Sequence, residues 1–198
     1  MLFRICLFGF MAQFTKKAII EAFYKLLSEK PLDRITVKEI IEECGVTRNT
    51  FYYYYSDVYE LFEKELTEAT DMIIDDINRS EKLDEISLKL VGEAVRNKKL
   101  IKNVYLSREK GGADRHISET VDRIADAFVN GASLHMSDLS ADDIKIMRRI
   151  YKCTLLGVID EWLGGRMEDF SDKDIEKMAA LLKKIPQLVT DDRNKCSE

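Results

Sequence analysis

The sequence contains few of the residues that interrupt regular backbone structure. Its 198 residues include only two prolines and nine glycines. A β architecture needs many turns, and glycine and proline are among the residues that turns use most. Apolar residues recur at helical spacing throughout the chain instead. The composition and the periodicity together predict an all-α protein.

Residues that ligate metals or act as nucleophiles are also scarce. There are two histidines, His116 and His135, and no CxxC pair among the scattered cysteines Cys6, Cys44, Cys153 and Cys196. This pattern excludes a zinc site and suits a reducing cytosol. The chain has no nucleophile elbow, phosphate-binding loop or carboxylates at ligand spacing. We therefore expect no metal, no cofactor and no enzymatic activity; a surface loop best explains His116 and Asp114 beside a Gly-Gly turn.

No hydrophobic run is long enough to cross a bilayer. Residues 1–13 are apolar, and Arg4 lies near their start, but no small-residue cleavage site follows, as a secretory signal requires. We expect this extension to be disordered, or to result from an upstream start codon with Met11 as the initiator. With 45% hydrophobic and 34% charged residues, the chain is expected to be cytoplasmic and to have no membrane partner.

The stretch from Ile35 to Tyr55 contains two helix starts in close succession. Thr36, followed three residues later by Glu39, has the spacing of a capping box at the start of a helix. Gly45 is suited to end that helix, because glycine tolerates the left-handed conformation. Only Val46 separates it from a second N-cap residue, Thr47. Two short helices joined so closely must cross steeply, so positions 36–55 predict a helix-turn-helix motif.

The second of these helices carries more polar and aromatic residues than a packing element needs. Phe51 and Tyr55 share one face and are the expected core contacts, and four consecutive tyrosines cannot all face the same core. The side chains that must then point outward can contact base edges and phosphates of DNA. They are Arg48, Asn49, Thr50, Tyr52 and Tyr53. Half-buried tyrosines with solvated hydroxyls are the alternative interpretation.

The same stretch closely resembles the DNA-binding domain of the TetR family of transcriptional regulators. The matching segments are Thr36-Val37-Lys38-Glu39-Ile40-Ile41, Gly45-Val46-Thr47 and Thr50-Phe51-Tyr52-Tyr53-Tyr54-Tyr55. The resemblance spans roughly residues 14 to 70, and within the family it is suggestive of regulators of the dihydroxyacetone kinase kind, some of which act with a protein partner. It implies that DNA is contacted by Lys16, Lys17, Thr36, Lys38, Thr47, Arg48, Asn49, Thr50, Tyr52, Tyr53, Tyr54 and Ser56.

Two features of the sequence weaken the expected contacts with the DNA backbone. Residues 1–57 carry eight Lys and Arg against seven Asp and Glu, and residues 58–198 carry 23 against 29. The part of the chain that contains the predicted DNA-binding domain is thus almost neutral, and the remainder is acidic. The non-specific affinity for DNA should therefore be modest and salt-sensitive. In the family a lysine often lies near position 58 and another basic residue near 56, whereas this chain has Val58 and Ser56.

Outside the helix-turn-helix, the sequence predicts amphipathic helices that contain no recognisable sequence motif. We expect helices at Phe14–Glu29, Asp57–Arg79, Leu83–Arg96, Lys98–Ser107, Arg115–Leu134, Ser140–Gly164 and Ser171–Ile185. By resemblance, the last two form a homodimer interface and the domain encloses a ligand pocket. Candidate wall residues are Tyr105, His116, Phe128, Met147, Tyr151 and Trp162, although each is also a suitable core residue.

These observations predict a domain organisation and a function. After an extension at 1–13, residues 14–57 form a three-helix DNA-binding domain, 58–190 a helical ligand-binding and dimerisation domain, and 191–198 a tail. We expect a transcriptional regulator, most simply a repressor, that binds a palindromic operator in double-stranded DNA as a homodimer and responds to an unknown small-molecule inducer or protein partner. The alternative is a coregulator or interaction module that depends on a protein partner and binds DNA weakly.

Overall fold

The computed structural model describes residues 2–79, 83–107, 113–133 and 139–164, together with 173–174, 177–178 and 181. Every regular element in these ranges is a helix, and none of them contains a strand. The prediction of an all-α fold is confirmed. Most of the expected helix at 171–185 and all of the expected tail lie outside the described residues.

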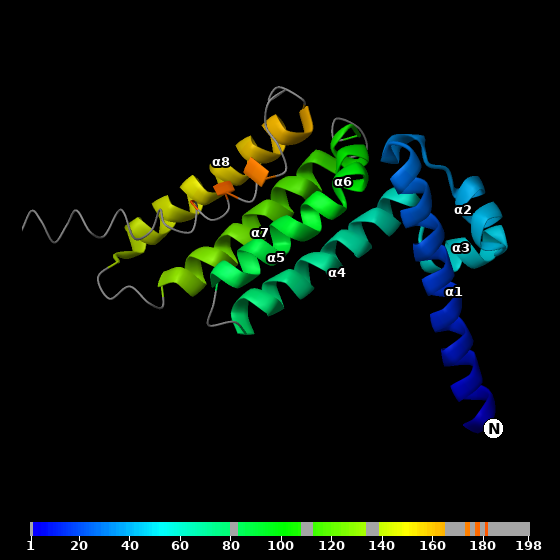
Figure 1. Ribbon diagram of the computed structural model, residues 1–198. Helices are drawn as coiled ribbons and strands as arrows, with labels where there is room; N and C mark the ends of the chain where they lie inside the picture. The colour runs from blue at the N-terminus through cyan, green and yellow to red at the C-terminus, as the bar shows by residue number, and fades with distance from the viewer. Residues whose placement is uncertain are drawn as a thin grey trace, which may run out of the picture. The chain divides into compact units, whose positions relative to one another are not determined.

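The helices follow one another along the chain with short connections (Figure 1). A single 3-10 turn, η1, lies between the first two α-helices. In order, the elements are α1 Leu2–Glu29, η1 Leu32–Arg34, α2 Val37–Cys44, α3 Arg48–Tyr54, α4 Val58–Arg79, α5 Leu83–Arg96, α6 Lys98–Tyr105, α7 Ala113–Ser133 and α8 Ala141–Gly164.

The start of the first helix differs from the prediction. α1 begins at Leu2 and not at Phe14, so the segment that was expected to be a disordered extension is helical. The physical reason is that residues 2–13 contain no proline and one glycine, so nothing in them terminates a helix. The other helix bounds differ from the predictions by two residues or fewer.

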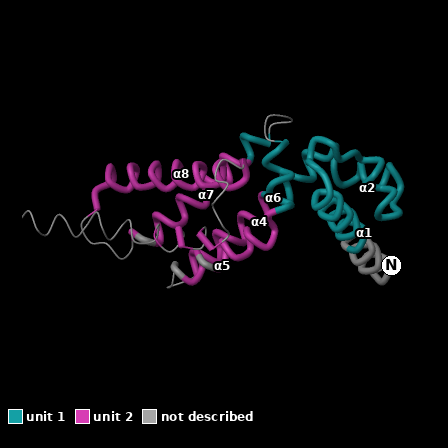
Figure 2. The backbone as a smooth tube through the Cα atoms, turned by 45° about the horizontal axis from the view of Figure 1, so that its top comes forward, with its two compact units in different colours: residues 1–66, 99–116 teal, residues 67–98, 117–198 magenta. Residues whose placement is uncertain are grey.

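The molecule divides into two compact units (Figure 2). Unit 1 comprises residues 1–66 and 99–116, and unit 2 comprises 67–98 and 117–198. The sequence predicted one boundary, between residues 57 and 58. The structure differs because the first part of α4, up to Leu66, belongs to unit 1 and because α6 packs with the first helices of the chain. Unit 1 is therefore built from two separate stretches of sequence.

Unit 1 is a small helical domain with its own core. Its completely or almost completely buried apolar residues include Ile19, Phe23, Leu27, Leu32, Ile40, Phe51, Tyr55, Leu61 and Ala113. Polar groups after α6 complete it. The Asp33 amide donates to the Ser107 hydroxyl at 3.1 Å, and that hydroxyl donates to Asp33 Oδ1 at 3.0 Å. This reciprocal pair joins η1 to a residue 74 positions later.

Unit 2 contains the second part of α4 together with α5, α7 and α8, which lie alongside one another in Figures 1 and 2. Its core cluster contains Ile77, Ile86 and Ala127, one residue from each of α4, α5 and α7. Half-buried residues pack around it: Ile73, Ile74, Leu90, Ile124 and Phe128. This unit therefore has an apolar interior separate from that of unit 1.

Candidate functional site

The two helices of the predicted motif begin and end where their capping residues place them. Thr36 Oγ1 accepts from the Glu39 amide at 3.3 Å, and Glu39 Oε2 accepts from the Thr36 amide at 3.0 Å, which completes the capping box. Gly45 ends α2 with φ 70° and donates to the Ile41 carbonyl at 2.9 Å. Thr47 caps α3 by accepting from the Thr50 amide at 3.2 Å. These local interactions fix the helix-turn-helix and its tight connection.

α3 has one buried face and one exposed face. Phe51 and Tyr55 are 0% and 1% exposed and anchor the helix in the core of unit 1. Tyr52 is 44% exposed and Tyr53 is 81% exposed. The polar residues that precede them, Arg48 and Asn49, are also exposed. The prediction that at least two tyrosines of the run face solvent is confirmed.

Polar groups on the exposed face of α3 are held in place by their neighbours. The Arg48 guanidinium donates to the Tyr52 hydroxyl at 3.3 Å and lies 5.6 Å from the centre of its ring. The hydroxyls of Thr47 and Thr50 lie 2.7 Å apart. Guanidinium, amide and hydroxyl groups are the groups that bind guanine, adenine and phosphate. The face is therefore chemically suited to DNA and partly preorganised.

Two of the lysines predicted to contact DNA, Lys17 and Lys38, are paired with glutamates on the surface. Lys17 lies 3.7 Å from Glu21, and Lys38 lies 3.7 Å from Glu42, each one helical turn away. All four side chains are more than 60% exposed. Ion pairs this exposed contribute little stability, so phosphate can compete for the lysines at low cost. Thr36 and Ser56 are exposed as well.

Two neighbouring positions show what sequence reasoning missed. Val58 is 7% exposed and belongs to the core, so a solvated lysine at this position would lose that packing. Lys64 is the basic residue beside the end of α3: its Nζ donates to the Tyr54 carbonyl at 3.3 Å and pairs with Glu60 at 2.8 Å. Asp57 caps α4 by accepting from the Glu60 amide at 2.8 Å. Only the spacing of Lys64, two turns after this cap, could have suggested it. Tyr54 itself is half-buried.

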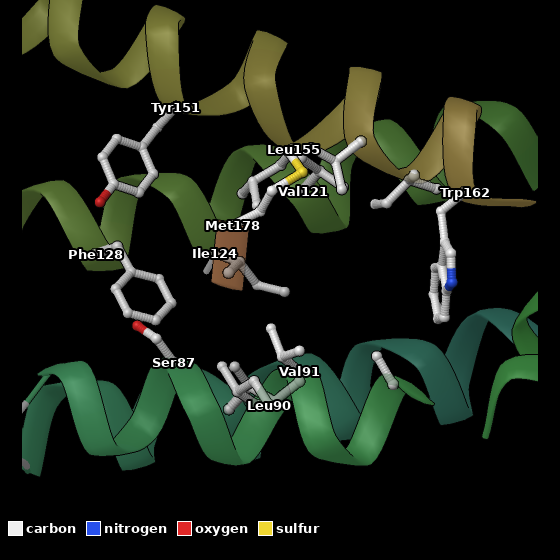
Figure 3. Close-up of a pocket in the computed structure, with 14 residues that line it drawn as sticks. Ser87, Leu90, Val91, Val121, Ile124, Phe128, Tyr151, Leu155, Trp162 and Met178 are labelled. Carbon is white, nitrogen blue, oxygen red and sulfur yellow. The ribbon is translucent and has the colours of Figure 1, made fainter. Parts of the chain in front are cut away.

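A second candidate site is a cavity of about 300 Å³ in unit 2 (Figure 3). It is lined by Ile73, Ser87, Leu90, Val91, Ala94, Val121, Ile124, Phe128, Tyr151, Leu155, Val158, Ile159, Trp162 and Met178. Every one of these residues belongs to unit 2. They come from α4, α5, α7 and α8, with Met178 from a later segment.

The cavity includes three of the six residues predicted to contact a ligand. Phe128, Tyr151 and Trp162 line it, and burial raises the pKa of the Tyr151 phenol. Met147 is buried but is not part of the lining. Tyr105 and His116 belong to unit 1, where His116 Nδ1 lies 3.7 Å from a carboxylate oxygen of Glu63. Helical periodicity cannot separate core from cavity wall, because both are apolar faces.

Two further findings apply to the described residues. None of them form a group of three or more histidine, cysteine or acidic side chains that could hold a metal ion. No helix among them combines the length and the apolar character needed to cross a membrane.

Part of the sequence matches the model of a known protein family. Residues 19–64 match the sequence model described as bacterial regulatory proteins, tetR family. That range contains α2, α3 and most of the buried residues of unit 1 that precede α6. No curated protein matches the chain.

Solved structures with the same fold cover most of the chain. One is the dihydroxyacetone kinase operon activator DhaS, with a TM-score of 0.66, 16% identity, and coverage of 86% of this chain and 93% of that one. Another is a TetR transcriptional regulator from Streptococcus agalactiae, with a TM-score of 0.65, 18% identity, and coverage of 90% and 98%. A third is a TetR-family regulator from Syntrophomonas wolfei, with a TM-score of 0.66, 15% identity, and coverage of 87% of this chain and 95% of that one. At these identities the likeness is one of fold.

Proposed function

We propose that this chain, which belongs to the TetR family of DNA-binding transcriptional regulators, binds a palindromic operator as a homodimer through the exposed face of α3. Members of this family are non-enzymatic. The observation that carries the proposal is the division of α3, which buries Phe51 and Tyr55 while Arg48, Asn49 and Tyr53 are exposed. An exposed row of this composition at the second helix of a helix-turn-helix is suited to the major groove.

A dimer is supported by a second apolar face on α8. Ile146 and Ile150 are 58% and 44% exposed, and Cys153 and Gly157 continue their row at helical spacing. At 100° per residue this row lies opposite the face of α8 that lines the cavity. Exposed aliphatic side chains beside small residues allow two helices to approach closely. We therefore place the two-fold contact of the homodimer on this row, with the later helix expected from the sequence beside it.

α4 provides a route by which an effector could change DNA binding. Val58, Leu61 and Phe62 of α4 are buried in unit 1, and Ile73 of the same helix lines the cavity in unit 2. A ligand that favours one position of α4 would alter the separation of the two α3 helices in the dimer. Half-sites lie about one turn of DNA apart, so such a change weakens operator binding. In this proposal the protein acts in the cytoplasm and represses transcription until its effector binds.

The proposal is tested by a gel shift with the DNA upstream of the protein's own gene. We expect a specific complex with two protomers that weakens as salt is raised. Arg48→Ala should lower the affinity at least about tenfold, because it removes a bidentate donor to base or phosphate. The matched control is Arg79→Ala. It removes an exposed arginine that is paired with Asp75 and lies at the C-terminal end of α4. Equal affinity of both variants and the wild type would contradict the assignment of α3.

The alternative, a coregulator that needs a protein partner, is favoured by the buried Val58 and by the lysines paired with glutamates. It predicts no complex with DNA at low salt from a folded, dimeric protein. Addition of the partner would then restore the shift. The same gel-shift experiment therefore separates the two functions.

A further inference from the structure

Among the residues that the structure describes, none of those that line the cavity in unit 2 carries a charged side chain. Of the 14 residues that line it, 11 are aliphatic residues, phenylalanine or methionine. Polar atoms come from the side chains of Ser87, Tyr151 and Trp162. All three are neutral groups in the pH range of a cell. The cavity can therefore offer a ligand apolar contact and a few uncharged hydrogen-bonding groups.

A charged ligand would be poorly solvated in such a site. Transfer of an ion from water to an apolar cavity costs its hydration free energy, and only a buried counter-charge or several hydrogen bonds can offset that cost. The raised pKa of Tyr151 has the same physical cause, because burial disfavours the phenolate. The lining thus selects for an uncharged molecule.

The few polar groups are not distributed evenly along the cavity. Figure 3 shows the hydroxyls of Ser87 and Tyr151 at one end, on either side of Phe128, and Trp162 at the other end. Between them lie the aliphatic side chains of Leu90, Val91, Val121, Ile124 and Leu155. An occupant that fits this arrangement has an apolar body and one polar group.

We propose that the cavity binds an uncharged, elongated, mainly apolar small molecule whose single hydroxyl or carbonyl group lies between Ser87 and Tyr151. The volume of about 300 Å³ lies at the lower end of the range of small-molecule sites. The regulatory consequence rests on the function proposed above, whereas the binding itself does not.

The ammonium group of Lys98 lies near the cavity and makes a carboxylate the strongest competing ligand. Lys98 Nζ lies 5.1 Å from the centre of the Trp162 ring, although Lys98 is not part of the lining. A fatty acid could place its carboxylate toward this ammonium. The test therefore compares an alcohol and a carboxylate with the same alkyl chain.

The only tryptophan of the protein lines the cavity, so its fluorescence reports occupancy directly. The full-length protein is titrated with 1-decanol, decanoate and glycerol, each below its aggregation threshold. We expect a saturable change with 1-decanol, binding of decanoate at least about tenfold weaker because of the desolvation of its charge, and no change with glycerol. Tighter binding of decanoate, or no binding of 1-decanol, would overturn the proposal.

Two variants locate the binding. Val91→Phe fills the cavity from α5 and should abolish the response, whereas Leu106→Phe, a matched change at a residue 57% exposed and outside the lining, should preserve it. Tyr151→Phe keeps the volume and removes only the hydroxyl. It should weaken 1-decanol binding about three- to tenfold, the usual effect of one lost hydrogen bond, and leave decane binding unchanged. An equal effect on both ligands would contradict the placement of the polar group.

The fluorescence titration contains no DNA, so its outcome does not depend on whether α3 binds an operator. Release of operator DNA by 1-decanol in the gel shift tests the regulatory step separately. Binding of 1-decanol without release would overturn that step while the ligand class is confirmed. Failure of the protein to bind DNA at all would count against the function proposed above and not against the cavity.

Discussion

The side-chain amide of Asn103 donates a hydrogen bond of 2.8 Å to the backbone carbonyl of Leu27, a residue 76 positions earlier. Leu27 lies in the last turn of α1, whose final carbonyls have no partner within the helix. Both residues are buried, at 8% and 1% exposure. Asn103 therefore caps α1 from α6 and helps to hold the second stretch of unit 1 against the first.

We expect Asn103→Ala to destabilise unit 1 by about 1–3 kcal/mol, because the buried Leu27 carbonyl loses its partner without access to water. Urea unfolding followed by circular dichroism measures the change. The control is Asn97→Ala, since Asn97 is exposed and bonds to the Glu93 carbonyl at 2.9 Å. If the two variants lose the same stability, the bond from Asn103 to Leu27 has no special role.

Replacement of Gly45 by alanine should destabilise the helix-turn-helix by about 1–2 kcal/mol. The cause is its φ of 70°, where a side chain is strained even though a Cβ would meet nothing within 4 Å. Gly92→Ala in α5 is the matched change in ordinary helical backbone, and there alanine should stabilise by about 0.5–1 kcal/mol. Thermal unfolding of both variants tests the opposite signs, and a stabilising effect of Gly45→Ala would refute the conformational argument.

Glu60 should stabilise the start of α4 in a pH-dependent way. A hydrogen bond from Lys64, reinforced by the Ser56 amide, lowers the pKa of this carboxyl from 4.5 to about 2. Because the pKa is lowered on folding, the contribution is complete above about pH 4.5 and is lost as the pH falls toward 2. Glu60→Gln should therefore lower Tm at pH 7, and the difference from the wild type should shrink between pH 4.5 and 3. A constant difference across that range would contradict this origin.

The proposed dimer contact on α8 can be separated from general surface effects. Ile150→Glu would bury a charge in the interface and should raise the dimer dissociation constant at least about tenfold. Met72→Glu makes the same chemical change at a residue 63% exposed on α4, and it should leave the dimer intact. Sedimentation of the two variants over a range of concentrations measures the constants. Dissociation by both, or by neither, would place the interface elsewhere.

The helix-turn-helix was predictable because its determinants are close in sequence. Thr36 with Glu39, Gly45, and Thr47 each act within one turn of helix, so spacing alone reveals them. The same holds for the exposed tyrosines of α3, because 100° steps place Phe51 and Tyr55 on one face. The start of α1 was missed for the opposite reason: no local signal marks it, and the helix extends through residues that merely permit it.

The ligand candidates show where local reasoning ends. Phe128, Tyr151 and Trp162 line the cavity, whereas Met147, an equally suitable residue on the same helix as Tyr151, is buried outside it. All four have the side chains of a helix core. Which of them meets a void depends on how four helices pack, and the spacing within one helix does not record that packing.

The sequence by itself determined the all-α fold, the helix-turn-helix with its caps, and the polar outward face of α3. Tertiary structure alone decided that α6 packs in unit 1 through Asn103 and Ser107, and that Val58 is buried. It also decided which apolar residues line the cavity. Each of these depends on residues tens of positions apart, such as Asn103 and Leu27. Local free energies fix caps and periodicity, whereas the desolvation of a distant carbonyl or the shape of a void is set only when separate helices meet.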